Sequence, residues 1–501
     1  MDNFDLNGLV SALKKTGRMT IGAFRDFLSQ TENEFTPTEG KLSAKERLTA
    51  LFDAGTFTET GAFVRRRMSE FDGEKPDEFE GVITGWGSVG GRLVFAFSQD
   101  LSRTGGAVSE AHAKKICEIY RLAAENGAPV VGFFDSSGAF IPEGVRALAG
   151  YGRIMRASSR ASGVVPQIAV IPGYCSGASA VIASMFDISL IVDGDGSISV
   201  SPPFLTDGAG GAEFSASSGA VCGRVADDGA AVKAIRSLLP YLPDNNESGG
   251  LLIDTPDDAN RTVDVSSYLA SRDPKELLSS VADDGKFIEL YAECAPEIVT
   301  GLCSFGGVPT GVVASNGSAG GGLLTSDAAR KAARVVSFFD GLNIPVLTVV
   351  DSSGLEKSAD AESAPYASSL AKLAAAYASA STPLVTLITG EAYGTAFAVL
   401  ASKAIGADVV MALGSAKIAA MPAPAAVAFL RNKDITAEVS REELEKIWDE
   451  TVANPAEAAS SGEIDEIIAP SEIRQRICSA IYMTSGKSGA WNARRHPTPS
   501  L

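Results

Sequence analysis

Four segments in the first half of this chain return in its second half, each displaced by 216 or 217 residues. Four pairs in nearly one register indicate an internal duplication, and a repeat of this length predicts two copies of one domain architecture. The pairs are VGGRLVFAFSQ (89–99) with FGGVPTGVVAS (305–315), SEAHAKK (109–115) with SDAARKA (326–332), VVGFFDSSGAF (130–140) with VLTVVDSSGLE (346–356), and IAVIPGYCSGASAVIAS (168–184) with VTLITGEAYGTAFAVLAS (385–402).

Each copy predicts the same order of elements. Two alternating apolar runs joined by Gly-Gly are typical of a β-hairpin, and in the first copy a helix follows, from its N-cap Ser109 to Asn126-Gly127. A short apolar strand then ends at Asp135, and a later strand ends at the glycine turn of residues 173–177. Apolar runs that alternate with helices predict a parallel sheet covered on both faces. The DSSG turns and the glycine turns then lie at the carboxyl ends of strands, where ligands bind in such sheets.

The repeat also predicts where the domains divide. The first copy runs from about residue 80 to 245 and the second from about 295 to 470, with the polar segment YLPDNNESGG (241–250) between them. We therefore expect a helical preamble of the first domain at 1–80, an N-terminal domain at 81–247 and a C-terminal domain at 248–501.

The composition argues against several classes of function. A net charge of −18 argues against a nucleic-acid footprint, which needs clustered Lys and Arg. The six cysteines and two histidines show no metal-ligand spacing, so we expect no metal site. No secretory signal is found, and no apolar run reaches the roughly 18 residues that a membrane span needs. These features favour a cytoplasmic protein.

The first glycine turn, GYCSGASA (173–180), presents a Cys-Ser pair where a strand meets a helix. A nucleophile at Cys175 or Ser176 would need a base, normally a histidine held by a carboxylate. The chain offers only His112 and His496, and His496 stands five residues from the C-terminus. The nucleophile hypothesis therefore lacks an obvious partner.

The second copy argues further against a nucleophile. Ala392 and Tyr393 stand at the positions of the Cys-Ser pair, and within the turn only Gly177 and Gly394 are shared. What the two turns share is therefore backbone. The first amides of a helix lack an intrahelical acceptor, and glycine lets a ligand oxygen approach them, so two such amides can form an oxyanion hole. The alternative is that both glycines only permit close packing of the helix on the sheet.

These segments resemble the carboxyltransferase family of biotin-dependent acyl-CoA carboxylases and sodium-pumping acyl-CoA decarboxylases. The likeness runs from about residue 41 to the C-terminus and is greatest to propionyl-CoA carboxylase β subunits and to methylmalonyl- or glutaconyl-CoA decarboxylase α subunits. The similar segments include AKERLTALFDAGTFTETGAF (44–63), GVITGWGSVGGRLVFAFSQD (81–100), PEGVRALAGYGRIMRASSRASGVVPQIAVI (142–171) and NPAEAASSGEIDEIIAPSEIRQRI (454–477).

The resemblance implies a fold and an assembly. The fold is α/β, with two tandem duplicated crotonase-like (ClpP/crotonase, spiral ββα) domains. The N-terminal domain would bind acyl-CoA and the C-terminal domain biotin. The active sites would lie between subunits of dimers within a homo-oligomer, usually a hexamer.

The resemblance also assigns site residues. The amides of Gly177 and Ala178 would hold the acyl thioester, and those of Gly394 and Thr395 the biotin carbonyl; these four are the expected catalytic residues. The expected substrate-binding residues are Ser137, Gly138, Ala139, Cys175, Ser176, Tyr393, Ala396 and Ala398.

The implied reaction moves a carboxyl group between carrier-bound biotin and the α-carbon of an acyl-CoA, through enolates held in the two holes. No biotin-attachment motif and no phosphate-binding loop are present in the sequence, so the biotin carboxyl carrier protein is expected to be a separate chain. A biotin carboxylase, or a membrane sodium-pump decarboxylase subunit, would be a further partner. With such a pump, the protein would be peripheral at the inner membrane.

Several segments depart from the family pattern, among them two turns. DSSGAFIPEG (135–144) stands where the family has DSGGARIQEG, and YGTA (393–396) stands where it has YGGA. The departures leave two alternatives open: a non-catalytic scaffold paralogue of such a complex, or another CoA-thioester enzyme, a hydrolase or hydratase, on the crotonase fold.

Other polar residues have structural interpretations. Asp135 and Asp351 end strands and are expected to cap the helices that follow. His112 is expected to be structural or to contact CoA phosphate or adenine, and Lys403 to lie at the surface. The acyl-CoA and the direction of transfer stay open on the sequence.

Overall fold

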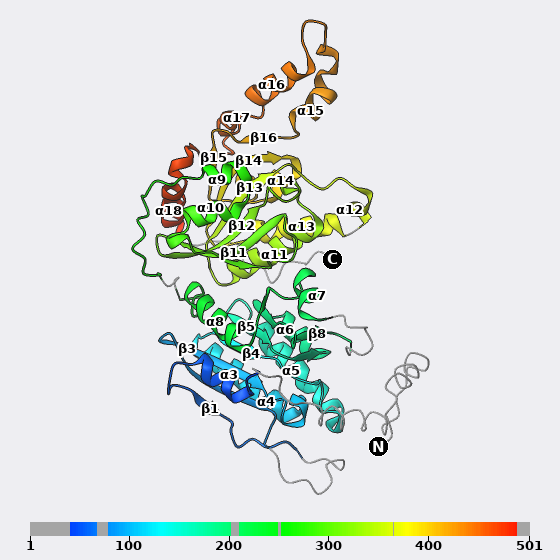
Figure 1. Cartoon of the computed structure of the whole chain (residues 1–501), viewed down its shortest axis with the longest axis vertical. Helices are drawn as coiled ribbons and strands as arrows, with labels where there is room; N and C mark the ends of the chain where they lie inside the picture. The colour runs from blue at the N-terminus through cyan, green and yellow to red at the C-terminus, as the bar shows by residue number, and fades with distance from the viewer. Residues whose placement is uncertain (1–40, 68–78, 202–209, 249–251, 364, 488–501) are drawn as a thin grey trace. The chain divides into compact units, whose positions relative to one another are not determined.

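A computed structural model of the chain describes residues 41–67, 79–201, 210–248, 252–363 and 365–487 (Figure 1). The chain divides into two compact units, Met1–Ser237 and Leu238–Leu501, called unit 1 and unit 2 below. Most of the helical preamble expected at 1–80 lies outside the described residues, as does His496.

The described strands of unit 1 are β1 (Thr58–Thr60), β2 (Val82–Val89), β3 (Arg92–Gln99), β4 (Val130–Phe133), β5 (Gln167–Ile171), β6 (Tyr174–Ser176), β7 (Ile188–Val192), β8 (Ser197–Ser199) and β9 (Gly223–Val225). They form a seven-stranded sheet in the order β1-β2-β3-β4-β5-β7-β9 and a small sheet of β6 and β8. The pairs β1·β2 and β2·β3 are antiparallel, whereas every pair from β3 onward is parallel. The predicted parallel sheet with a leading hairpin is confirmed.

The helices of unit 1 are α3 (Ala44–Leu51), α4 (Glu110–Asn126), α5 (Val145–Ala161), α6 (Ala178–Ser184), α7 (Ala212–Ser217) and α8 (Asp228–Leu238). Helix α4 begins after the predicted N-cap Ser109 and ends at Gly127, which adopts the left-handed conformation. Its apolar face and those of α5 and α6 pack on one face of the sheet. There the rings of Phe97, Phe134 and Phe186 meet edge to face at 5.3 to 5.4 Å.

The described strands of unit 2 are β10 (Ile288–Leu290), β11 (Ile298–Phe305), β12 (Val308–Ser315), β13 (Val346–Ser352), β14 (Leu384–Tyr393), β15 (Val409–Leu413), β16 (Lys417–Ala419) and β17 (Glu466–Ile468). Their order, β10-β11-β12-β13-β14-β15-β17, is that of unit 1, with β16 paired to the end of β14. The directions also match, since two antiparallel pairs are followed by parallel pairs. The duplication found in the sequence is therefore a duplication of topology.

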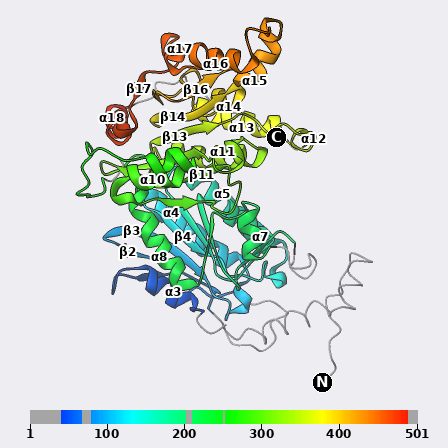
Figure 2. The same cartoon turned by 45° about the horizontal axis from the view of Figure 1, so that its top comes forward.

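The helices of unit 2 are α9 (Ser266–Ser271), α10 (Pro274–Val281), α11 (Ser326–Gly341), α12 (Ala359–Ser363), α13 (Tyr366–Ser379), α14 (Gly394–Val399), α15 (Ala423–Ala426), α16 (Arg441–Thr451), α17 (Pro455–Ser460) and α18 (Ile473–Thr484). Alternate strand residues such as Leu347, Val385 and Met411 point to one face and pack with α10 and α18. Helix α11 packs on β11 and β12 and against α13 (Figure 2). No helix in the described part of the chain is long and apolar enough to cross a membrane.

The helix that follows each hairpin corrects the sequence alignment by one residue. The sequence repeat pairs Ser109 with Ser326, but the N-cap of α11 is Thr325. The true displacement is therefore 216 residues here too, and it makes Lys115 and Lys331 equivalent. Both lysines are buried and donate to backbone carbonyls at the start of a hairpin strand, Lys115 to Val82 O and Lys331 to Ile298 O among others.

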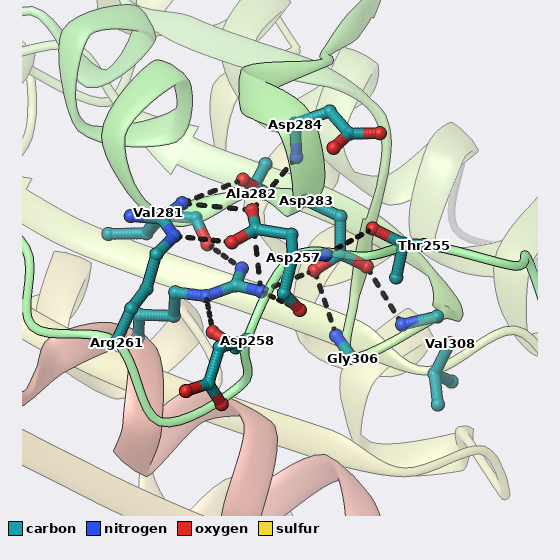
Figure 3. Close-up of polar contacts among 12 residues, drawn as sticks. Thr255, Asp257, Asp258, Arg261, Val281, Ala282, Asp283, Asp284, Gly306 and Val308 are labelled. Atoms are coloured by element: carbon teal, nitrogen blue, oxygen red, sulfur yellow. Dashed lines mark hydrogen bonds and ion pairs between the residues drawn. The ribbon is translucent and has the colours of Figure 1, made fainter.

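An aspartate holds the hairpin turn of each unit. In unit 2 the Asp283 carboxylate accepts hydrogen bonds from the amides of Gly306 and Gly307 at 3.0 and 2.8 Å, and it pairs with Arg474 of α18 at 2.7 Å (Figure 3). In unit 1 Asp53 binds the corresponding Gly-Gly turn in the same way, with an arginine of α8 as its partner. The repeated architecture therefore includes a helix before the hairpin (α3 or α10) and a helix near the C-terminal end of the unit (α8 or α18).

Candidate functional site

Three glycine-containing turns meet at the carboxyl ends of the central strands of unit 1. The first is the 3₁₀ turn Thr104–Gly106 after β3, the second is the DSSG turn of residues 135–138 after β4, and the third is the glycine turn of residues 173–177. The Ser137 amide donates to Gly105 O at 2.9 Å, which joins the first turn to the second. The Ser136 amide donates to Tyr174 O at 2.7 Å, which joins the second turn to the third.

Unit 2 repeats the three turns with matching contacts. Its turns are Gly320–Gly322, the DSSG turn of residues 351–354 and the glycine turn of residues 390–394. The Ser353 amide donates to Gly321 O at 3.2 Å, and Ser352 pairs with Ala392 across the sheet. Because the same three turns adjoin in both units, the duplicated feature is a cluster of turns and not a single loop.

Equivalent glycines in the turns share their backbone conformation. Gly177 and Gly394 have φ of +63° and +58°, a region that costs residues with a side chain about 1–2 kcal/mol. Gly106 and Gly322 also have positive φ, and a Cβ on either would lie 2.3 Å from the carbonyl oxygen of the strand-end aspartate. Thr395 does not adopt positive φ, so its β-branch fits the second turn.

The amides of the third turn are not equivalent as donors. The Gly177 amide donates to Ser199 O at 2.8 Å, so it is engaged within the protein. The next amide belongs to Ala178, the first residue of α6, where no intrahelical acceptor exists. In unit 2 helix α14 begins at Gly394 itself, with Thr395 second and exposed. The amides that lack an intrahelical acceptor therefore begin at Ala178 in unit 1 and at Gly394 in unit 2.

Cys175 and Ser176, in the glycine turn of unit 1, are not placed for nucleophilic attack. Cys175 is fully buried in the core of unit 1, and burial raises the pKa of its thiol well above the ordinary value. Ser176 is half-buried and pairs with Ser199 on β8. His112 is also fully buried, its Nε2 lies 3.2 Å from Gln99 Nε2, and burial lowers its pKa to about 3. A neutral, enclosed imidazole does not serve these side chains as a base.

A cavity of about 570 Å³ opens beside the second glycine turn, within unit 2. Of the expected residues, Tyr393, Gly394 and Thr395 line it, whereas Ala396 and Ala398 do not. Burial raises the pKa of Tyr393 to about 12, so its phenol stays protonated. Residues that sequence reasoning did not name also line it, among them Ser353, Gly354, Leu355, Glu356, Lys357, Met421 and Pro422.

The expected substrate-binding residues of unit 1 follow one another around two turns. Ser137 is exposed and Gly138 and Ala139 are half-buried, on the turn after β4. The isolated bridge between Ser136 and Cys175 brings this turn beside the first glycine turn. Ser136, directly before these residues, is therefore beside Cys175, three residues before Ala178.

The two strand-end aspartates do not cap helices, which corrects the expectation for Asp135 and Asp351. The N-cap position of α5 is held by Gly144. The helix that follows Asp351 is α12, which begins at Ala359, and there the Ser358 hydroxyl accepts from the Ala361 amide. Both carboxylates turn instead toward buried or half-buried cations. Sequence reasoning missed those cations because they come from distant segments of the chain.

The chain has close likeness to a known family. The carboxyl transferase domain family matches residues 36–498. Methylmalonyl-CoA decarboxylase subunit alpha of Propionigenium modestum is 37% identical over 480 residues, which cover 91% of this chain and 93% of that protein. Propionyl-CoA carboxylase beta chain of Roseobacter denitrificans is 37% identical over 476 residues, with the same coverage of both chains.

A solved structure shows the same fold. Transcarboxylase 12S, described as a hexamer assembly with hydrolysed methylmalonyl-CoA bound, has a TM-score of 0.88 at 29% identity, over 97% of this chain and 100% of that chain. This likeness confirms the expected fold class, two tandem crotonase-like domains.

Proposed function

Because the chain belongs to the carboxyl transferase family, we propose that its two sets of glycine turns hold the two reactants of a carboxyl-group transfer. The chain is a biotin-dependent acyl-CoA carboxyltransferase of the propionyl-CoA carboxylase and methylmalonyl-CoA decarboxylase kind. The observation that carries the more detailed proposal is the duplication of the turns. A transfer between two carbonyl compounds needs two places where negative charge on oxygen is stabilised, and the chain has two sites of one geometry.

Unit 1 is the proposed acyl-CoA site. The DSSG turn that follows β4 adjoins the first glycine turn through Ser136 and Cys175, and that glycine turn leads directly to the Ala178 amide. Backbone amides fixed in this way can stabilise a thioester oxygen as it gains negative charge, and losing one such donor typically costs about 3 kcal/mol of barrier. Gly177 contributes through its φ of +63°, which sets the course of the chain directly before that amide.

Unit 2 is the proposed biotin site. Its 570 Å³ cavity is of the size of small-molecule sites. The lining includes apolar side chains (Leu355, Met421 and Pro422), charged side chains (Glu356, Lys357 and Glu362) and the backbone of Gly394 and Thr395. In this proposal the rings of a neutral cyclic urea contact the apolar side chains, and its carbonyl oxygen accepts from the amides of the turn. Biotin would carry the carboxyl group on a nitrogen of its cyclic urea, and in this proposal it arrives on a separate carrier chain.

The protein's own residues would orient the reactants and stabilise charge. Cys175 and His112 are enclosed, and Tyr393 keeps its proton. The turns contribute backbone amides and hydroxyls, and in unit 2 the charged side chains of Glu356 and Lys357 also line the cavity. Orientation of two reactants at such a site can account for several kcal/mol of rate enhancement.

The proposed partners follow from the same family. A biotin carboxyl carrier protein would visit unit 2, and a biotin carboxylase or a membrane decarboxylase subunit would set the direction of transfer. Since transcarboxylase 12S, which has the same fold, is described as a hexamer, we include a hexamer of this chain in the proposal.

The test is a biotin-dependent decarboxylation. Purified protein is incubated with malonyl-CoA or methylmalonyl-CoA and free biotin, and loss of the acyl carboxyl group is followed by chromatography. Loss that requires both biotin and native protein is expected. Absence of decarboxylation with every member of a panel of carboxylated acyl-CoAs, while the native oligomer stays intact, would instead support a non-catalytic scaffold.

A further inference from the structure

The carboxylate of Asp135 lies where β4 gives way to the DSSG turn. It is buried and bound by two cations, since Lys41 Nζ lies 3.2 Å and Arg47 Nη1 3.1 Å from its Oδ2. Arg47 is itself fixed by Asp228 of α8 at 3.0 Å. The second oxygen, Oδ1, has no hydrogen-bond partner among the described residues and faces Gly173. A Cβ on Gly173 would lie 2.0 Å from that oxygen, so only glycine leaves room for it.

Asp351 occupies the same place in unit 2. It is buried, and the guanidinium of Arg272 binds it through two nitrogens, with Nε 2.7 Å from Oδ2. The Glu391 amide, at the start of the second glycine turn, donates to its Oδ1 at 2.9 Å. A Cβ on Gly390 would lie 2.1 Å from Oδ1, the equivalent of the approach at Gly173.

The two units reach this arrangement with different cations. Lys41 and Arg47 come from the segment at α3, whereas Arg272 follows α9 and adopts φ of +61°. The units share the carboxylate itself and a glycine at the start of the third turn, whose missing side chain leaves room for that carboxylate. A device that served only to neutralise a buried charge would not need the carboxylate to press on that one glycine in both copies.

We propose that Asp135 and Asp351 are positioning residues of the two reactant sites. Each carboxylate, held by its cations, fixes the entry of the third glycine turn and so aims the amides that follow it, at Ala178 and at Gly394. In this role each aspartate acts through the turn beside it. This inference rests on the proposed function, because the turns that it positions are those assigned to acyl-CoA and to biotin.

The duplication supplies a matched test with Gly173→Ala and Gly390→Ala. Each added methyl must push aside one carboxylate and leaves the other unit unchanged. Gly390→Ala is expected to weaken kcat/KM for free biotin about 100-fold while the KM for acyl-CoA stays within about twofold, since misplacement of about 1 Å has effects of that size. Gly173→Ala is expected to do the reverse. Gly152→Ala is the control, because a Cβ there meets nothing within 4 Å.

A second pair of variants changes Arg272, the cation that binds Asp351, and leaves Gly390 as it is. Arg272 is partly exposed, so Arg272→Gln leaves a folded protein in which Asp351 has lost its clamp. It should reproduce the biotin defect of Gly390→Ala, and Arg272→Lys should restore part of the activity. Equal effects on both reactants, or no effect of either glycine variant, would overturn the inference.

Hydrogen exchange separates this inference from the proposed function. Faster exchange of the amides at 391–396 in Gly390→Ala, with 174–179 unchanged, supports positioning even if the wild-type protein shows no biotin-dependent activity. Absence of biotin-dependent activity in the wild-type protein counts against the proposed function and not against the positioning role. Unchanged exchange in both turns counts against the positioning role.

Discussion

The thiol of Cys175 lies directly beneath the first glycine turn, in the core between the sheet and its helices. Burial favours the neutral thiol, so its pKa is raised and the reactive thiolate is not populated near neutral pH. The same burial means that the side chain contributes packing. Its sulfur is small, and its removal leaves a correspondingly small cavity.

The first prediction follows from that packing role. Cys175→Ala is expected to keep most of the wild-type kcat, with a loss of stability of about 1 kcal/mol from the lost packing. Biotin-dependent decarboxylation and thermal unfolding measure the two quantities. The native protein should also resist iodoacetamide at this residue, as peptide mapping can show. Complete loss of activity, with the fold intact, would contradict the backbone interpretation of the turn.

His112 gives a prediction about pH. Its folded pKa, about 3, lies below the ordinary value of 6.5 because burial disfavours the imidazolium. Between these values the unfolded chain binds the extra proton, so the contribution of His112 to stability is complete above pH 6.5 and is lost as the pH falls toward 3. The loss amounts to about 2 kcal/mol on going from pH 7 to pH 5.

The test compares the wild type with His112→Gln, which keeps an acceptor for Gln99 and does not titrate. Urea unfolding of unit 1, followed by pulse proteolysis at pH 7 and pH 5, should show a smaller acid-induced loss in the variant. Equal losses in the two proteins would mean that His112 already takes up its proton in the folded state.

Among the elements, α18 and α8 show the same contact in two environments. Arg474 on α18 is fully buried and pairs with Asp283, whereas Arg236 on α8 is partly exposed where it pairs with Asp53. Removing one partner of a buried pair leaves an uncompensated charge, at a cost of about 3–5 kcal/mol. Water screens the exposed pair and replaces much of what is lost.

Arg474→Ala is therefore expected to destabilise unit 2 by about 3–5 kcal/mol. Arg236→Ala, its matched control, should destabilise unit 1 by clearly less. Urea unfolding with proteolytic fragments assigned to each unit distinguishes the two. Equal losses of unfolding free energy in the two variants would show that burial does not set the strength of these two ion pairs.

The hairpin, the first helix and the central strands could be predicted from the sequence because their displacement between the two copies stays at 216 or 217 residues. The sequence comparison did not pair helix α3 with α10. The aspartates that follow them, Asp53 and Asp283, nevertheless bind the hairpin turns in the same way. The reason is a length difference, since the loop between β1 and β2 is longer than that between β10 and β11 and shifts the register. A fixed-displacement comparison does not follow such a shift.

The glycine turns were predictable for a physical reason, and the cations around them were not. Gly177 and Gly394 must be glycine because of their positive φ, so both copies keep them. Lys41, Arg47 and Arg272 instead come from unrelated segments, since any cation that reaches the carboxylate suffices. Contacts between distant segments of this kind leave no pattern along the chain.

For the whole molecule, large apolar side chains remain exposed in the single chain described. Val145 and Leu148 on α5 are 77% and 61% exposed, and Phe429 and Leu430 before α16 are 80% and 60% exposed. Adjacent exposed apolar residues on well-formed elements are typical of surfaces that another chain covers. In the proposed hexamer, further copies of this chain would cover these two patches.

The native mass is therefore expected to be about six times 51.8 kDa in light scattering coupled to size exclusion. Leu148→Glu or Phe429→Glu places a charge in an apolar contact and should lower the mass, without unfolding a chain whose substituted residue is exposed in isolation. Tyr482→Glu, at an exposed position elsewhere on unit 2, gives the control. A wild-type mass of 51.8 kDa, unchanged by either substitution, would contradict assembly through these patches and would leave the exposed residues to be covered by a different chain.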